Sequence, residues 1–477
     1  MMHSMLIDGE WVERDEWLVV DDPDSGDEVG RVPVALPEDV DLAVESATRA
    51  FSRRLPSHER SRVLADTATL LEQRNEEAAE LIAREGIKTI NEARAEARRA
   101  VVTLLLSAEQ AKRISGQTLN LDQHPSGSSM MGISVREPIG VVGAITPFND
   151  PLNLVAHKVG PALASGNAVI VKPDSKTPLS ALLLAEIFEK SGLPPGYLQV
   201  ITGHGRVVGD AVVRHPGVGM ISFTGGVEAG RAIHVRAGLK EISMELGANN
   251  AVIVASDADI DLAAERIGSG AFWAAGQNCL HVQRVLAHRQ VVDELTERLV
   301  EYASSRVLGP KLDDATDMGP LIDSSAVQRT ESTVSDALHR GGELLCGGAS
   351  QGTRFEPTLV AHVPAGARLH SEEIYGPVTV IAAFEALEDA IEKANDTDYG
   401  LAGAVFTSDI ETAFTVASRL RAGQVMINES TDFRIDAMPF GGGGSSGIGR
   451  EGVAHAVDEM TEPKVVAFAG VDVPGMG

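Results

Sequence analysis

Cysteine is scarce in this chain: 477 residues contain only Cys279 and Cys346. Two cysteines in a chain of this length cannot build a disulfide framework, and free thiols fit a reducing cytoplasm. The first eight residues contain no basic region followed by a long apolar run, so we expect no signal peptide. Apolar runs such as residues 169–171 are far too short to span a membrane. We therefore expect a cytoplasmic protein with no membrane partner.

Positive charge is also in short supply, with 41 Lys and Arg against 68 Asp and Glu and a formal net charge of −27. A surface this acidic repels nucleic acid, so nucleic acid is not an expected partner. The 13 histidines show no metal-ligand spacing, and no metal site is expected. There is no repeat of solenoid length.

The residues that are present alternate between strand-like and helical patterns. Residues 139–145 predict a strand and residues 153–164 a helix, and the alternation continues to residue 237, then again from 251 to 302 and from 361 to 421. This is the pattern of βαβ units on parallel sheets. We expect an α/β protein with two such domains and a boundary near residues 245–250. The segment up to about Gln117 is expected to be mostly helical, and the Arg- and Glu-rich helix at 91–100 is interpreted as a solvated face.

Two apolar segments lie outside this alternation, at residues 132–138 and 464–468. Strands detached from a domain sheet need an edge to pair with, and a neighbouring subunit is a plausible source.

Three side chains of complementary chemistry follow predicted strands or a helix-to-strand turn. Cys279 lies in Gly276-Gln277-Asn278-Cys279, Glu245 precedes Gly247, and Asn149 follows the strand at 139–145. A lone cysteine is by default a small buried hydrophobe. At strand ends of open sheets, however, a thiol, a carboxylate and an amide suit a nucleophile, a base and an oxyanion donor.

At this point the sequence resembles the aldehyde dehydrogenase superfamily over nearly its whole length. The resemblance lies in seven motifs in the family's order: Pro147-Phe148-Asn149, Val171-Lys172-Pro173, Phe223-Thr224-Gly225-Gly226, Met244-Glu245-Leu246-Gly247, Gly276-Gln277-Asn278-Cys279, Glu372-Glu373-Ile374-Tyr375-Gly376-Pro377 and Pro439-Phe440-Gly441-Gly442. It implies a Rossmann-like parallel-sheet cofactor domain (1–117 and 139–246), an α/β catalytic domain (247–430), oligomerisation strands (118–138 and 461–477) and an active-site loop that returns to the cofactor domain (431–460). It also implies a homodimer or homotetramer.

The resemblance assigns roles to individual residues. Cys279 would attack the aldehyde, Asn149 would hold the oxyanion, and Glu245 would activate the water that cleaves the thioester. NADP or NAD would be the cofactor, with Lys172 on the adenosine ribose and Glu373 on the nicotinamide ribose. The remaining cofactor contacts would come from Thr146, Pro147, Phe148, Thr224, Gly225, Gly226 and Tyr375.

The sequence departs from the family pattern at a few positions. Phe148 replaces a frequent Trp, Gly226 replaces a frequent Ser, and Gly443 and Gly444 replace a bulkier pair ending in Lys. None removes a catalytic group. The glycine pattern at 203–209 is interpreted as a strand-to-helix turn, and Cys346 as structural.

Cofactor preference and substrate class depend on fewer residues. NAD-restricted relatives commonly carry Glu where this chain has Ser175, followed by Lys176, so NADP is expected to bind at least as well as NAD. The substrate funnel is expected to offer His157, His281 and Arg434, which suits a small polar or anionic aldehyde. This combination resembles the branch of lactaldehyde and non-phosphorylating glyceraldehyde-3-phosphate dehydrogenases. Arg434 would bind the anion, or pair with Asp432 or Asp436 at the surface.

Two alternatives remain. An acylating, coenzyme A-dependent member of the family often lacks the base, which Glu245 supplies here. A catalytically inactive structural or binding relative usually lacks the Cys or the base, and both are present.

Overall fold

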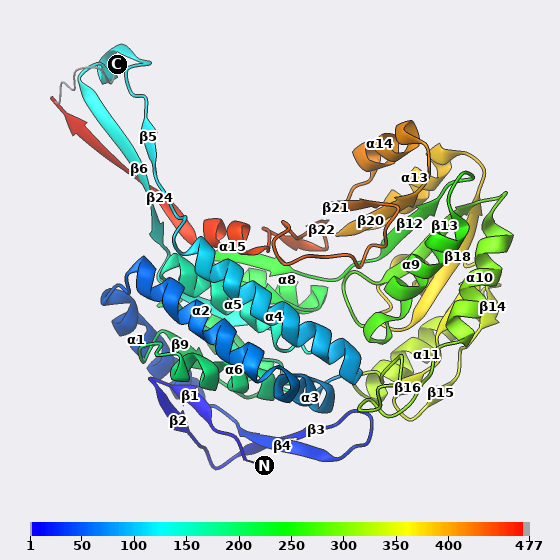
Figure 1. Ribbon diagram of the computed structural model, residues 1–477, viewed down its shortest axis with the longest axis horizontal. Helices are drawn as coiled ribbons and strands as arrows, with labels where there is room; N and C mark the ends of the chain where they lie inside the picture. Colours follow the sequence, from blue (N-terminus) through cyan, green and yellow to red (C-terminus); the bar gives the residue numbers. More distant parts are fainter. Residues whose placement is uncertain (1, 471–477) are drawn as a thin grey trace.

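Two open sheets covered by helices organise the chain, and a three-stranded arm projects from the first of them (Figure 1). The computed structural model describes residues 2–470. Most of the strands in both large sheets run parallel, which confirms the predicted α/β class.

The first sheet has eight strands in the order β2-β1-β9-β8-β7-β10-β11-β23. Its parallel centre comprises β7 (Val141–Ile145), β8 (Ala168–Lys172), β9 (Leu198–Val200), β10 (Met220–Thr224) and β11 (Glu241–Glu245). Antiparallel strands close its edges: β1 (Met5–Ile7), β2 (Glu10–Val12) and β23 (Gly447–Ile448).

Helices cover the first sheet. They are α1 (Pro37–Ser52), α2 (Ser57–Gln73), α3 (Asn75–Glu85), α4 (Ile90–Gln110), α5 (Asn153–Ser165), α6 (Leu179–Lys190), α7 (Asp210–Arg214), α8 (Val227–Ala237) and α15 (Val453–Glu459). One π-helical turn, Gly205–Gly209, precedes α7 and forms the expected strand-to-helix turn.

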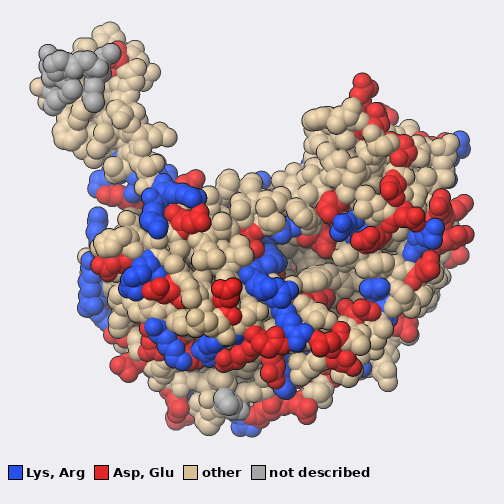
Figure 2. Space-filling model, in the orientation of Figure 1, with Lys and Arg blue, Asp and Glu red and all other residues tan. Residues whose placement is uncertain are grey.

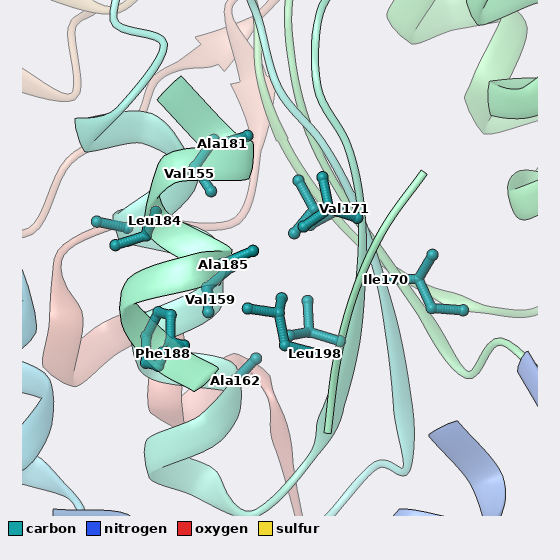
Figure 3. Close-up of a cluster of buried hydrophobic side chains, with 14 of the residues drawn as sticks. Val155, Val159, Ala162, Ile170, Val171, Ala181, Leu184, Ala185, Phe188 and Leu198 are labelled. Carbon is teal, nitrogen blue, oxygen red and sulfur yellow. The ribbon is translucent and has the colours of Figure 1, made fainter. Parts of the chain in front are cut away.

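Because helices cover both faces of the sheet, the central strands are mostly apolar and buried. Figure 3 shows Val171 of β8 and Leu198 of β9 on the side of the sheet that faces α6, the helix of Leu184 and Phe188, and Ile170 of β8 on the opposite side. All five side chains are buried, and they belong to one continuous core. Because burial of such side chains stabilises by about 1.5–3 kcal/mol each, this layer fixes the strands whose ends carry the site.

The N-terminal segment is mostly helical, as expected, but four short strands precede its helices. Besides β1 and β2, a two-stranded ribbon forms from β3 (Trp17–Asp21) and β4 (Glu28–Pro33). These strands were not predicted, because runs of three to six residues give little periodicity.

The second sheet has seven strands in the order β14-β17-β18-β13-β12-β20-β21. They are β12 (Asn250–Val254), β13 (Val282–His288), β14 (Glu343–Cys346), β17 (Thr358–Ala361), β18 (Val378–Phe384), β20 (Ala402–Phe406) and β21 (Gln424–Ile427). Its helices are α9 (Ile260–Phe272), α10 (Val292–Ser304), α11 (Ser324–His339), α12 (Arg368–Ser371), α13 (Leu387–Asn395) and α14 (Ile410–Arg419). Two small ribbons pair β15 (Ser350–Gln351) with β16 (Arg354–Phe355), and β19 (Tyr399–Gly400) with β22 (Gly443–Gly444).

The arm is built from β5 (Gln117–Leu119), β6 (Met130–Pro138) and β24 (Thr461–Ala469). The two detached strands of the sequence are therefore not unpaired: β24 pairs antiparallel with β6 over its full length. In Figure 2 the arm shows few charged side chains, and Val465 and Phe468 are exposed on it. Residues 471–477, which the sequence assigned to the same oligomerisation segment, lie outside the described residues.

Within residues 2–470, no helix is long and apolar enough to cross a membrane. The same residues contain no cluster of three or more His, Cys, Asp or Glu side chains arranged to hold a metal ion.

Candidate active site

The carboxyl ends of four adjacent strands bring together residues that are far apart in the sequence. Ile145 of β7 lies beside Lys172 of β8, and Thr224 of β10 lies beside Glu245 of β11. Asn149 follows four residues after the end of β7. Ligands of open parallel sheets bind beyond these ends, so the first sheet presents an amide, an ammonium and two further polar groups to one region.

Cys279 lies on a tight turn between α9 and β13. Ala274 and Ala275 both have φ of 51°, and Gly276 has φ of 68°. A Cβ on Gly276 would come within 2.2 Å of the Gly376 carbonyl oxygen, so only glycine fits here. The carbonyl of Cys279 accepts a hydrogen bond of 2.8 Å from the Asn250 carboxamide. Cys279 is therefore held by a backbone that has little freedom.

Helix α4 supports both sides of the site with two buried glutamates. The Glu96 carboxylate accepts from the backbone amides of Leu152 and Asn153 at 2.8 and 3.0 Å, at the start of α5. One turn earlier, Glu92 accepts from the Ala274 amide at 2.7 Å. The interpretation of residues 91–100 as a solvated face was therefore wrong: both carboxylates satisfy buried backbone amides, which a charged group does strongly.

A cavity of about 840 Å³ lies between the two sheets and contains most of the predicted site residues. Those that line it are Asn149, Glu245, Cys279, Thr146, Pro147, Phe148, Lys172, Thr224, Gly225, Gly226, Glu373, Tyr375 and Arg434. His157, His281, Ser175 and Lys176 are not among the lining residues.

The four remaining residues have other surroundings, and Ser175 is half-buried on the loop after β8. His157 is buried and its Nε2 lies 2.8 Å from the Asp436 carboxylate. His281 is also buried, and burial lowers its pKa to about 3, so its ring is neutral at physiological pH. The Lys176 ammonium forms an ion pair with the carboxylate of Asp323, which is the N-cap residue of α11.

Burial governs the electrostatics of Cys279 and Glu245. It raises the pKa of the Cys279 thiol to about 12, with a smaller contribution from Glu245, while Arg434 lowers it. Burial also raises the pKa of Glu245 well above its usual range, and the nearby Glu451 adds to that increase. Neither carboxyl oxygen of Glu245 has a hydrogen-bond partner among residues 2–470. A proton acceptor with a raised pKa and free oxygens suits a general base.

The other end of the cavity fits a dinucleotide. Gly226 is the N-cap of α8, no side chain caps that end, and a Cβ on Gly226 would meet nothing within 4 Å. The open N-terminus of this helix is suited to phosphate. Lys172 is buried, and burial lowers its pKa while Asp174 raises it. Glu373 accepts from the Ala248 amide at 2.8 Å, and burial raises its pKa to about 7. These groups match the donors and acceptors that a nicotinamide cofactor requires.

Arg434 neither pairs with Asp432 or Asp436 nor lies at the surface. Its side chain is 8% exposed, and Nη2 lies 3.3 Å from a Glu451 oxygen. The guanidinium lies 3.8 Å over the Phe440 ring. Its Nε is buried without a partner among the described residues.

Several cavity residues escaped the sequence analysis. Glu451 bonds to Lys158 of α5 at 2.9 Å as well as to Arg434. Asp174 lines the cavity, whereas the adjacent Ser175 does not. Asp432 and Arg434 both line the cavity. Strand alternation after Lys172 could have indicated Asp174, whereas no periodic signal covers the loop that carries Asp432.

Known proteins that are similar to this chain show which family it belongs to. The model of the aldehyde dehydrogenase family matches residues 11–466. The chain belongs to that family. The predicted family, fold and enzyme class, an NAD(P)-dependent aldehyde dehydrogenase, are therefore confirmed.

Three similar proteins illustrate the relationship. The chain is 45% identical over 449 residues to aspartate-semialdehyde dehydrogenase 1 of Pseudomonas canavaninivorans, covering 94% of this chain and 95% of that one. It is 37% identical over 468 residues to the lactaldehyde dehydrogenase of Methanococcus aeolicus, covering 97% and 99%. The structure of an NADP-dependent glyceraldehyde-3-phosphate dehydrogenase from Bacillus halodurans, complexed with NADP, superimposes with a TM-score of 0.96 at 37% identity, covering 99% and 100%.

Proposed function

We propose that this chain oxidises a small polar or anionic aldehyde to its carboxylic acid, with NADP or NAD, through a covalent intermediate on Cys279. The observation that carries the proposal is that Cys279, Asn149 and Glu245 line one cavity with the candidate cofactor residues.

The residues divide the chemistry as follows. The Cys279 sulfur, after losing its proton, forms a bond to the aldehyde carbon, and the carbonyl oxygen becomes an oxyanion. The Asn149 carboxamide and the backbone N–H of Cys279 would donate to that oxygen, and loss of one such donor typically slows the reaction about 100-fold or more. The chemistry supplied by a bound nicotinamide is hydride acceptance, which leaves a thioester on Cys279.

Glu245 completes the turnover. Its carboxylate would take a proton from water as the water oxygen attacks the thioester carbon, and the Cys279 sulfur leaves. The presence of this base on the cavity favours hydrolysis over transfer to coenzyme A. Together with Cys279 and Asn149, it also weighs against an inactive relative.

Arg434 supports a polar or anionic substrate. It lines the cavity, it is held in place by Glu451 and Phe440, and its Nε has no partner among residues 2–470. A guanidinium binds carboxylate and phosphate oxygens through paired, charge-assisted hydrogen bonds. Two of the similar proteins are named for substrates that carry an anionic group, aspartate semialdehyde and glyceraldehyde-3-phosphate. In this proposal His157 supports the loop through Asp436, and neither His157 nor His281 contacts the substrate.

The test is a substrate panel run with each cofactor and with or without coenzyme A. We expect kcat/KM to be higher for succinic semialdehyde, lactaldehyde and glyceraldehyde-3-phosphate than for hexanal and benzaldehyde, and the product to be the free acid. Arg434→Ala is expected to lower kcat/KM for the anionic aldehydes about tenfold or more. A preference for hexanal or benzaldehyde, or an acyl-coenzyme A product, would contradict the proposal.

A further inference from the structure

Asp432 differs from the other acidic residues of its segment. Residues 429–451 contain four carboxylates, and three of them have cationic partners. Glu429 pairs with Arg266 at 3.6 Å, Asp436 with Arg99 at 2.8 Å, and Glu451 with Lys158 at 2.9 Å. Asp432 forms no ion pair with any side chain in residues 2–470 and lines the cavity.

The position of Asp432 is fixed by the wall of the cavity. It lies against α9, where a Cβ on Gly270 would be 3.0 Å from its Oδ1. Burial raises the pKa of Asp432, and a hydrogen bond with Ser430 lowers it; among its charged neighbours, Glu429 raises this pKa and Arg266 lowers it. Since Arg266 is already engaged with Glu429, the Asp432 carboxylate lacks a cation of its own.

Arg434 provides the opposite charge two residues further along the same loop. Its Nε is buried and has no partner in the described part of the chain, so one loop of the cavity wall carries an incompletely used cation and an anion without an ion pair. Two aromatic side chains, Trp273 and Phe433, line the same cavity and are 36% and 45% exposed. Aromatic faces and a carboxylate are the groups that bind an ammonium.

We infer that the substrate is an amino-acid semialdehyde, whose carboxylate binds Arg434 and whose ammonium group binds Asp432. The two side chains lie two residues apart on one loop and line one cavity, so they suit a ligand that carries both charges, as an amino acid does. A substrate with only a negative charge would leave Asp432 unpaired and would be repelled by it. The ammonium group takes no part in the reaction and only orients the aldehyde toward Cys279. The inference rests on the proposed function.

The experiment compares two aldehydes that differ by one amino group, succinic semialdehyde and aspartate semialdehyde. In the wild-type holoenzyme, kcat/KM is expected to be at least about tenfold higher for aspartate semialdehyde, the effect of one charged hydrogen bond. Asp432→Asn is expected to remove this preference, and Asp432→Glu to keep part of it. Asp261→Asn, an exposed aspartate of α9 that is not a lining residue, removes the same charge elsewhere and is expected to keep the full preference.

A second readout does not depend on turnover. Calorimetric titration with the two product acids, aspartate and succinate, is expected to show tighter binding of aspartate to wild type and equal binding to Asp432→Asn. Equal kcat/KM values in wild type, or a preference that persists in Asp432→Asn, would overturn the inference while leaving the proposed function intact. Oxidation of neither aldehyde, with hexanal oxidised well, would instead reject the proposed substrate class. Aspartate binding that depends on Asp432 would then still support the ammonium site.

Discussion

Replacing Glu245 with glutamine changes one proton-accepting oxygen and almost nothing else. Both carboxyl oxygens are buried and have no hydrogen-bond partner among the described residues, so no existing bond is broken. The carboxyl group has a pKa raised by burial and by Glu451, so a neutral amide resembles its protonated form. We therefore expect Glu245→Gln to fold normally, with a melting temperature close to that of wild type.

The expected decrease in the rate of thioester hydrolysis follows from the contribution of a general base to that step. General base catalysis typically contributes 100- to 10,000-fold, so hydrolysis of the thioester is expected to slow by at least about 100-fold, or about 2.7 kcal/mol. Formation of the thioester depends on Cys279 and is expected to remain faster than hydrolysis. Rapid mixing should then show a burst of about one equivalent of reduced cofactor, and intact-protein mass spectrometry should detect the acyl-enzyme.

The rate of thioester hydrolysis is expected to increase with pH. Because the pKa of Glu245 is raised, the carboxyl is protonated and inactive below that pKa and becomes a competent base as the pH rises through it. Wild-type deacylation is expected to increase as the pH rises through this raised pKa, and the increase should disappear in Glu245→Gln. A steady-state rate near that of wild type, with no burst and no acyl-enzyme, would refute the assignment of the base.

Three further predictions concern the nucleophile, the cofactor and the arm. Cys279→Ala is expected to lose more than about 1,000-fold in aldehyde oxidation while fluorescence titration shows unchanged cofactor affinity, and substantial residual turnover would exclude the covalent mechanism. NADP is expected to bind at least as tightly as NAD. Asp323→Asn removes the ion-pair partner of Lys176 and should increase the affinity for NADP but not for NAD. A strong preference of the wild-type enzyme for NAD would contradict the expected cofactor preference. Deleting residues from Thr461 onward should convert a homodimer or homotetramer into monomer or aggregate, and Val465→Arg on the exposed arm should do so with β24 in place; an intact oligomer in light scattering for both variants would rule out this role for the arm.

Residues that the sequence ties to a strand end or a sequence motif line one cavity in the structure, and their catalytic roles stay predictions. Cys279, Glu245 and Asn149 come from three separate motifs, and the parallel topology explains why they meet. Sequence reasoning failed where the partner is distant in the sequence. Nothing in residues 429–436 indicates that Arg434 would pair with Glu451, or that Asp432 would remain unpaired.

The helix at 91–100 shows the same limit. An Arg- and Glu-rich pattern is usually a solvated face, yet Glu92 and Glu96 point to buried backbone amides. The amides that they satisfy belong to loops at residues 152–153 and 274, which only the tertiary structure brings to this helix. Charge patterning alone therefore cannot distinguish a solvated glutamate from one that holds a loop.

The two glutamates of α4 have a consequence for motion within the molecule. Glu96 holds the start of α5, just after Asn149, and Glu92 holds Ala274, just before Cys279. Asn149 follows a strand of the first sheet and Cys279 precedes a strand of the second. The backbone near each of them is nevertheless hydrogen-bonded to the same helix, α4. Small movements of the two sheet domains relative to each other would therefore move Cys279 and Asn149 together. The distance between these two residues should change only when α4 itself unfolds locally. In mild denaturant, loss of activity is accordingly expected to coincide with hydrogen exchange of the α4 amides. It is not expected to coincide with exchange that occurs earlier elsewhere in the two sheet domains.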